Sequence, residues 1–555
     1  MAESKTDSVE RNASHHGKNF LMLGHDHGSY YYLPSGSKQV VALTVAEHIE
    51  SRLIGLAPDE NFWRKNYGTE HGISWRLARQ DLLSRQHMAG IYDPSRIRGR
   101  GAWWDSNQAV LHLGDKLIIN GENHHLSDSR KYIYEAMSPI SLSHTNPLSC
   151  AEAKAVSRIC DLISWERPIN SRYLAGWCAI APICGALDWR PHIYLTGSRG
   201  TGKTYIVDKV IRRLIGDIGL AVQSATTEAG LRQTLRHDSR PVMFDEIEGE
   251  DPRAQLRIQN ILELARQASS ETGAAIVKGS ATGEPTTFRI RSCFAFSSIT
   301  YAVTSSPDAS RVSVLGLEVD HNQERFSRLA ALIAGTLTDE YVSRFLARSI
   351  HMIPTIRENA RRFAAATASV LGSQRAGDQI GALLSGAYSL HSDGIITPEA
   401  AVDWVRTQDW SEQRGINEDT DEMKCLNRIL QHVIRAQTKH GPVDRSVAEL
   451  VGVASSDSQD EVLSVRSAED ILGRNGIRGE DGLIFISVSH NALSDILKGT
   501  PWAKNWSRIL RRLPGATSTP NPVRFRATRS RAVAIPYQER EETREEAEVQ
   551  EEIFV

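Results

Sequence analysis

The chain has 555 residues, of which 40% are hydrophobic and 24% are charged, and its 65 Lys and Arg residues nearly balance its 67 Asp and Glu residues. This composition is typical of a soluble globular protein with several domains, and it excludes a uniformly basic surface. The 6 cysteines form no CxxC pair, which excludes a disulfide scaffold and disfavours a zinc ribbon. No apolar run is long enough to span a membrane, so we expect a cytoplasmic protein without a membrane partner.

Three segments are predicted in the first part of the chain. Residues 1–18 are polar and lack the apolar stretch of a secretory signal, so we expect a disordered N-terminus. Residues 19–148 alternate short β-type runs with helical patterns, which predicts an α+β domain. Across residues 149–320, the apolar runs HIYLTG, PVMFDE and CFAFSSI alternate with helical patterns. That alternation predicts an α/β core, a parallel sheet covered by helices.

The rest of the chain is predicted to hold a helical subdomain, a second domain and a tail. Residues 321–412 are helical in pattern almost throughout. In residues 421–537, three helical patterns precede the strand GLIFISV, a further helix and the strand RAVAIPY, and this order suits a winged-helix-like DNA-binding domain. Residues 538–555 contain eight Glu and two Arg, a net charge of −6. Because the whole chain carries −2, the remainder carries +4 and has room for local basic patches.

The most specific motif is the glycine-rich loop GSRGTGKT, which fits G-x4-G-K-T between a strand-like run and a helical pattern. Glycines let backbone N–H groups turn toward phosphates, and the helix N-terminus adds positive potential. We expect the loop to bind ATP through Gly197, Ser198, Arg199, Gly200, Thr201, Gly202, Lys203 and Thr204. Lys203 would reach the β- and γ-phosphates, and the Thr204 hydroxyl would bind Mg²⁺. The alternative is a glycine-rich turn with a chance lysine.

A second motif, the apolar run Val242-Met-Phe followed by Asp245 and Glu246, lies about forty residues further on. An apolar strand that ends in two acids is the expected partner of a P-loop. Asp245 would bind Mg²⁺ through water, and Glu246 would polarise the attacking water. Alone, such an acidic pair is usually solvated, but together the two motifs predict ATP hydrolysis.

A candidate hairpin lies between the acidic pair and CFAFSSI. In AAIVKGSATGEPTTFRI, two β-type runs flank a Gly/Ser/Thr turn, and Lys278 lies near the tip. A lysine there could follow the phosphates of a single DNA strand, whereas an ordinary solvated lysine is the alternative.

The most one-sided basic stretch runs from Ala503 to Arg531 and contains no acid. Its basic residues are Lys504, Arg508, Arg511, Arg512, Arg524, Arg526, Arg529 and Arg531. Because three aromatic residues interleave with them and the stretch falls on the expected winged helix, we predict salt-dependent binding of duplex DNA there. The alternative is that these arginines bind the protein's own acidic tail, which would make the tail an autoinhibitor.

The chain ends in Gln550-Glu-Glu-Ile553-Phe554-Val555. This pattern resembles the peptide that bacterial replication factors insert into the sliding clamp, with Ile553 and Phe554 in an apolar pocket and Gln550 at its rim. An acidic tail that ends in Ile-Phe also resembles the ends of bacterial single-strand binding proteins. A solvated tail without a partner is the alternative.

The segment from about Trp165 to Leu317 resembles the helicase domain of phage and integrative-element replication proteins, which are AAA+-type ring ATPases close to helicase superfamily 3. The resemblance is carried by PICGALDWRPHIYLTGSRGTGKT, PVMFDEIEG, VKGSATGEPTTFRIRS and RVSVLGL, and more weakly by IRGRGAWWD, QRAGDQIGALLSGAY and GTPWAKNW. It implies a hexamer. It also implies a stand-alone helicase or helicase loader, because the Cys cluster of a primase module is missing from the sequence.

Three further residues are candidates for completing a ring ATPase site. Ser298, or its neighbour Ser297, ends the CFAFSSI run and could sense the phosphate, although ring ATPases usually carry Asn or Thr there. Arg311 follows a loop and could reach the γ-phosphate of a neighbouring subunit. Arg375 opens a helical pattern and could act as a second sensor within its own subunit. For both arginines, a surface residue with a salt bridge is the alternative.

Together these observations predict an oligomeric, Mg²⁺-dependent ATPase that moves along DNA in the replication of a phage or mobile element, with single-stranded DNA in the ring channel. One rival is an AAA+ ATPase that remodels or loads a protein partner, such as a helicase loader, a transposition regulator or a defence ATPase. Its activity would not depend on Lys278. A second rival is a DNA-binding adaptor with ATP only as a structural ligand, in which Glu246→Gln would leave function intact.

Overall fold

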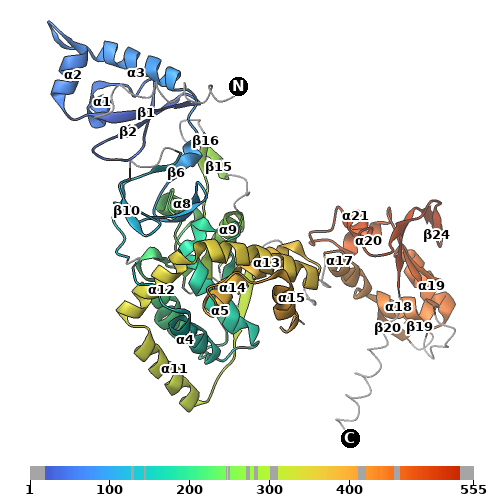
Figure 1. Ribbon diagram of the computed structural model, residues 1–555. Helices are drawn as coiled ribbons and strands as arrows, with labels where there is room; N and C mark the ends of the chain where they lie inside the picture. Colours follow the sequence, from blue (N-terminus) through green and yellow to red (C-terminus); the bar gives the residue numbers. More distant parts are fainter. Residues whose placement is uncertain are drawn as a thin grey trace, which may run out of the picture. The chain divides into compact units, whose positions relative to one another are not determined.

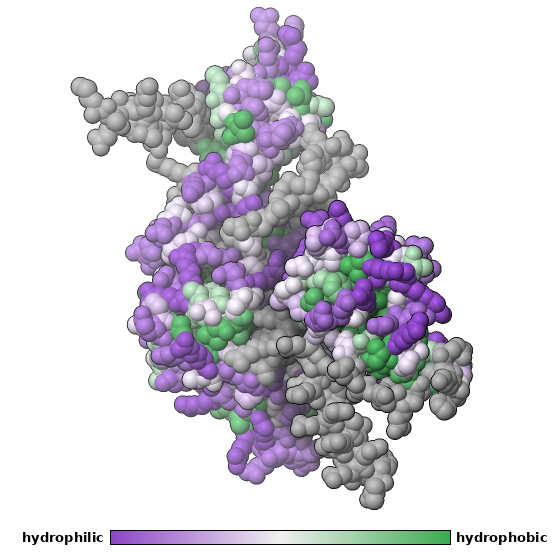
Figure 2. Space-filling model, turned by 90° about the vertical axis from the view of Figure 1, so that its right-hand side faces the viewer, coloured by the Kyte–Doolittle hydropathy of each residue, from purple (hydrophilic) through white to green (hydrophobic). Residues whose placement is uncertain are grey.

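The computed structural model divides into two compact units, Met1–Asp409 and Trp410–Val555, each of which is described by itself (Figure 1). The structure describes residues 19–126, 131–142, 145–245, 247, 251–270, 276–279, 285–299, 311–410, 421–438, 441–455 and 463–537. Within these ranges, no helix is both long and apolar enough to cross a lipid bilayer. On the face in Figure 2, hydrophilic residues predominate and hydrophobic ones are exposed in smaller areas among them.

The first unit begins with a three-stranded antiparallel sheet, in the order β1-β2-β3, that packs against helices. Its elements are β1 (Phe20–Asp26), β2 (Ser29–Pro34), β3 (Val41–Thr44), α1 (Glu50–Leu56), α2 (Glu60–Tyr67), β4 (Gly68–Thr69), β5 (Gly72–Ile73) and α3 (Trp75–Ala89). α3 begins where the Ser74 side chain accepts the Leu77 N–H, and it ends at Gly90, whose φ of 89° suits glycine. Phe20, Tyr32 and Trp63 are buried between the sheet and the helices.

A second small β region joins this part to the rest of the unit. Its elements are η1 (Pro94–Arg96), β6 (Ile97–Arg98), β7 (Gly101–Asp105), β8 (Gln108–His112), β9 (Leu117–Ile119), β10 (Glu122–His124) and β11 (Ile133–Tyr134). Arg100 forms an ion pair with buried Asp238 at 2.7 Å. Gly101 has a φ of +127°, and a Cβ there would lie 2.1 Å from the Ser239 oxygen. The close approach of these two backbones therefore requires glycine.

The centre of the first unit is a five-stranded sheet in the order β13-β14-β17-β12-β18, and all its strands are parallel. Its part of the chain contains α4 (Cys150–Asp161), α5 (Ile169–Ile180), η2 (Ala181–Ala186), β12 (His192–Gly197), α6 (Lys203–Ile206), η3 (Val207–Ile211), α7 (Arg212–Ile215), η4 (Gly216–Ile218), β13 (Leu220–Val222), α8 (Glu228–Leu235), β14 (Val242–Phe244), α9 (Pro252–Ala268), β15 (Ile276–Gly279), β16 (Pro285–Phe288), β17 (Phe294–Ser297) and β18 (Val312–Leu317). Tyr194, Phe244 and Phe296 stack in its core. The expected α/β core with a parallel sheet is confirmed.

Helices follow this sheet to the end of the first unit, as the helical pattern predicts. They are α11 (Gln323–Thr336), α12 (Asp339–His351), α13 (Ile353–Leu371), α14 (Gln374–Ser389) and α15 (Pro398–Arg406). α14 packs against both α13 and α5. α5 is buried on nearly every side, which fits the apolar sequence that follows its polar first turn.

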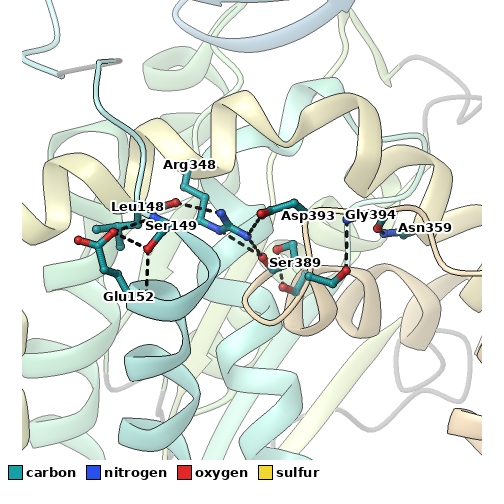
Figure 3. A network of polar contacts seen from close by, with 10 residues as sticks. Leu148, Ser149, Glu152, Arg348, Asn359, Ser389, Asp393 and Gly394 are labelled. Atoms are coloured by element: carbon teal, nitrogen blue, oxygen red, sulfur yellow. Dashed lines mark hydrogen bonds and ion pairs between the residues drawn. The ribbon is translucent and has the colours of Figure 1, made fainter.

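Arg348 on α12 fastens three separate segments to one another (Figure 3). Its guanidinium donates to the Leu148 oxygen at 2.9 Å, just before α4, and to the Ser389 oxygen at 2.6 Å, at the end of α14. It also pairs with Asp393 at 2.5 Å. Only 7% of the Arg348 side chain is exposed, so these bonds replace water for a buried charge.

The second unit contains α17 (Asp421–Leu430), β19 (Val433–Thr438), β20 (Gly441–Ser446), α18 (Val447–Ser455), α19 (Val465–Arg474), β21 (Ile477–Glu480), β22 (Leu483–Ser487), α20 (Asn491–Ile496), α21 (Trp506–Leu510), β23 (Thr517–Ser518), β24 (Val523–Phe525), β25 (Thr528–Ser530) and β26 (Ala532–Pro536). These five helices and a sheet in the order β21-β22-β26-β23 share one apolar core. The structure adds elements to the expected order. The antiparallel pair β19–β20 stands between the first two helices. A second such pair, β24–β25, precedes the last strand.

Candidate functional site

The glycine-rich loop lies at the carboxyl end of β12, in the middle of the sheet, and leads into α6. Gly200 and Gly202 have φ values of 87° and 83°, which residues with a Cβ rarely adopt. These two turns direct the chain around the loop so that α6 begins at Lys203. The strand, loop and helix expected from GSRGTGKT are therefore present, and the N-terminus of the helix is directed at the loop.

Lys203 folds back over its own loop. Its ammonium donates to the Ser198 oxygen at 3.0 Å and also to the Gly197 oxygen. The loop is held further by the Thr201 hydroxyl, which donates to the Ser198 oxygen at 2.9 Å. Thr204, in the first turn of the helix, is exposed. A lysine held by carbonyl oxygens at this place can exchange them for the oxygens of a bound phosphate.

Asp245 directly follows β14, which is separated from β12 by β17 alone. Because the strands are parallel, Asp245 and the glycine-rich loop lie at the same edge of the sheet. Its Oδ1 is buried and has no hydrogen-bond partner within the described part of the chain. A carboxylate oxygen of this kind fits a Mg²⁺ ion, which takes oxygen ligands and often keeps its own water. Glu246 lies outside the described residues.

Ser298 follows β17, between the two strands that carry the motifs. Its hydroxyl lies 2.7 Å from the Tyr194 hydroxyl, and the residue is 1% exposed. Ser297 is buried as well, and its backbone oxygen accepts the Ile247 N–H. The side chain of Ser298 is thus engaged inside the sheet.

Arg311 and Arg375 lie near the amino ends of the parallel strands, opposite the end that carries the glycine-rich loop. Arg311 directly precedes β18, whose first residue pairs with His192 at the start of β12. Arg375 is one helical turn before Gln379, which donates to the His192 oxygen at 2.9 Å. From His192 to the glycine-rich loop, β12 extends about 17 Å, given a rise of about 3.3 Å per residue. The structure therefore brings the two arginines to one edge and does not bring either to Lys203.

A cavity of about 340 Å³ opens beside the glycine-rich loop, and sequence reasoning missed it. Its walls come from the loop after α4, from the start of α6 and from the start of α11. The rings of Tyr205 and Phe326 line it with centroids 5.3 Å apart, and Phe326 is 53% exposed. Arg325 closes the wall by donating to the Leu162 and Ile163 oxygens at 2.9 and 3.0 Å. A cavity with two aromatic rings in its wall, beside a phosphate site, is suited to a nucleotide base.

Lys278 lies on β15, which pairs with β16 in antiparallel register opposite Thr286. The expected hairpin is therefore present, and the side chain of Lys278 lies outside what the structure describes. The expected tail contacts Gln550, Ile553 and Phe554 also lie outside the described residues, as do residues 1–18.

The basic stretch of the second unit spans α21, β23 and the β24–β25 pair, and it ends just before β26. All its basic residues are exposed, namely Lys504, Arg508, Arg511, Arg512, Arg524, Arg526, Arg529 and Arg531. Arg526 pairs with Asp470 at 3.1 Å, and Arg512 pairs with Glu422 at 3.4 Å. For two of the three interleaved aromatic residues the structure corrects the expectation, whereas Trp502 is half-buried. Trp506 and Phe525 are 6% and 1% exposed, because they belong to the core and offer no stacking surface.

Arg524 and Arg529 are direct cross-strand partners on β24 and β25. Like charges directly opposite one another destabilise a strand pair. The arrangement therefore leaves a local excess of positive charge that a polyanion would neutralise.

No family model matches the chain. No curated protein matches it either. Among solved structures, the chain is similar to the Cch active helicase of SCCmec type IV, with a TM-score of 0.46 and 12% identity over 93% of each chain. It is also similar to the A-form apo structure of the NrS-1 C-terminal region, with a TM-score of 0.31 and 10% identity over 77% of this chain and 96% of that one.

Proposed function

We propose that the chain is an oligomeric, ATP-dependent DNA helicase or translocase that acts in phage or mobile-element replication. The observation that supports this most is the position of the glycine-rich loop and the buried Asp245 oxygen at one edge of a parallel sheet, with a single strand between their strands. That arrangement suits an AAA+-type ATPase core. In the proposed protein this core is combined with an N-terminal α+β domain, a helical subdomain and a C-terminal winged-helix-like domain.

ATP with its Mg²⁺ would supply the phosphoanhydride bond whose hydrolysis drives movement. Lys203 would exchange the carbonyl oxygens of its loop for phosphate oxygens, and the exposed Thr204 hydroxyl would bind the metal. Asp245 would offer Oδ1 to the metal's water shell, and Glu246 would polarise the attacking water. Tyr205 and Phe326 would stack on the base.

The placement of Arg311 and Arg375 supports an assembly in which the ATP site lies between subunits, a hexamer in the family that the chain resembles. Because both arginines lie at the edge of the sheet away from their own glycine-rich loop, either could reach a γ-phosphate only in a neighbouring subunit. For Arg375 we therefore propose a role across the interface as an alternative to the predicted role of a sensor within its own subunit.

DNA would be bound at two places. The β15–β16 hairpin, with Lys278, would follow one strand in the ring channel. The exposed arginines around β24 and β25 would hold duplex DNA through its phosphates. The terminal Gln550, Ile553 and Phe554 would bind a sliding clamp or another replication factor.

The test is steady-state ATP hydrolysis with and without single-stranded DNA, for the wild type, Lys203→Ala and Lys278→Ala. We expect Lys203→Ala to abolish turnover, and Lys278→Ala to retain basal turnover but lose stimulation by DNA. Thr286→Ala, opposite Lys278 in the hairpin, is the matched control and should keep the stimulation. If the turnover rate is the same with and without DNA, and the same in Lys278→Ala as in the wild type, the helicase is excluded and an ATPase that remodels a protein partner is favoured.

A further inference from the structure

The helix that follows the glycine-rich loop carries an arginine that has no part in the chemistry described so far. Arg212 Nη1 lies 2.8 Å from Asp208 Oδ1, one turn earlier on the same helix. Its Nη2 lies 3.5 Å from Oδ2 of Asp245. One guanidinium therefore connects the helix of the phosphate loop to the acid at the end of β14.

The path of the helix explains how Arg212 reaches Asp245. The chain passes from α6 into a π turn, η3, and the Arg212 N–H donates to the Val207 oxygen five residues back. A π turn within a helix changes the direction of the side chains that follow, and such turns are frequent at functional sites. Arg212 is the first residue after it. Since helical side chains point toward the N-terminus, the guanidinium extends back toward the glycine-rich loop.

The contact leaves an unusual set of unsatisfied atoms. Asp245 Oδ1 and Arg212 Nε are both buried and without a hydrogen-bond partner within the described residues. Guanidinium and carboxylate can match in a two-bond arrangement that uses both carboxylate oxygens. Here the guanidinium approaches Oδ2 and leaves Oδ1 for another ligand.

We propose that Arg212 is a positioning residue that fixes the Asp245 carboxylate so that Oδ1 is directed to the Mg²⁺ of the bound nucleotide. The planar fork of arginine suits this role because its two Nη atoms contact Asp208 and Asp245 separately in a fixed geometry, whereas lysine offers a single ammonium on a flexible stem. The inference rests on the proposed ATP site, and it adds a residue that touches neither phosphate nor metal but sets the geometry of one that does.

The test measures metal-dependent nucleotide binding, which is independent of turnover. Mg²⁺ is titrated into the full chain with a fluorescent N-methylanthraniloyl ATP analogue, and anisotropy is recorded for the wild type, Arg212→Ala and Arg212→Lys. Arg213→Ala is the matched control, because Arg213 is the next residue on the helix and binds the Leu337 oxygen and Asp339 instead. Titrations in EDTA give the affinity without metal, and thermal unfolding verifies that each variant is folded.

We expect Arg212→Ala to raise the Mg²⁺ concentration at half-saturation about ten-fold, in line with the loss of other groups that orient a metal ligand. Its affinity in EDTA should stay within about two-fold of wild type, and Arg212→Lys should recover only part of the loss because it keeps the charge without the fork. An unchanged or lower Mg²⁺ requirement in both Arg212 variants overturns the inference. If the wild type binds nucleotide equally well with and without Mg²⁺, and Lys203→Ala binds it as tightly as the wild type, the proposed function is overturned, and the inference with it.

Discussion

The β24–β25 pair allows a test in which protein stability and DNA binding should change in opposite directions. Arg524 and Arg529 face each other across the two strands, and both are exposed. Replacing both with Ala removes a like-charge pair, which should leave the free energy of unfolding unchanged or raise it by up to about 1 kcal/mol. If the two arginines bind DNA phosphates, the same change should weaken DNA binding.

The size of the binding effect follows from the release of counterions. Each phosphate neutralised on duplex DNA contributes about 0.9 to the slope of log K against log salt concentration, so two lost contacts should reduce the slope by about 1.8. The ratio of wild-type to variant affinity should then grow about 3.5-fold for each halving of the salt concentration, as two to the power of 1.8. Single-stranded DNA should give a smaller reduction, about 1.4.

The assay is fluorescence anisotropy with a labelled duplex at several salt concentrations, combined with urea unfolding of the same samples. Arg474→Ala/Arg478→Ala is the matched control, because these two arginines of the second unit already pair with Asp470 and Glu480. An Arg524→Ala/Arg529→Ala slope equal to wild type would refute the assignment of this surface to DNA. A large loss of stability in the double variant would refute the reading of the two arginines as a repulsive pair.

Phe326→Ala should weaken ATP binding about two- to ten-fold through loss of an aromatic contact. The affinity for tripolyphosphate, which has no base, should stay unchanged when it is measured by competition. Equal losses of affinity for both ligands would mean that the base does not bind in this cavity. Arg348→Met should lower the free energy of unfolding by about 2–4 kcal/mol in urea titrations, because the buried Leu148 and Ser389 oxygens lose their donor, and a change under about 0.5 kcal/mol would contradict that role. Burial lowers the pKa of His192 to about 3, so the unfolded state, with an ordinary His pKa of about 6.5, binds the proton more readily. The free energy of unfolding should therefore fall by about 1.5 kcal/mol between pH 6.5 and pH 5. His192→Gln should lose that part of the pH dependence. An unchanged pH profile in His192→Gln would contradict this role of His192.

The central fold could be predicted because its signals are local. Apolar runs bounded by turn residues mark β12, β14 and β17, and GSRGTGKT fixes the transition from strand to helix. The β19–β20 pair could not be predicted in the same way. Its strands are six residues each, largely polar, and Val433 is 56% exposed, so over this length an alternating pattern does not differ clearly from a helical one.

The candidate site was only partly predictable, since several of its features depend on contacts between distant segments. The cavity wall combines Leu162, Tyr205 and Phe326, which share no pattern in the sequence. The contact between Arg212 and Asp245 depends on a π turn that no motif indicates. The side-chain directions of buried aromatic residues were also not predictable, because a Trp among arginines looks the same in sequence whether it stacks on DNA or fills a core.

The glycine-rich loop and Arg311 lie at opposite ends of the parallel strands, and this separation leads to a last prediction. In one chain the glycine-rich loop and Arg311 are separated by the length of β12, more than an arginine side chain can reach, so a complete site would need two subunits. Lys203→Ala and Arg311→Ala should each be inactive alone, yet an equal mixture should recover turnover at about a quarter of its interfaces, where an intact loop meets an intact Arg311 from a neighbour in a head-to-tail ring. Assembly must first be verified for both variants by light scattering. A mixture of assembled variants as inactive as its components would mean that Arg311 does not act across the interface, and the ATP site would then have to be complete within one subunit.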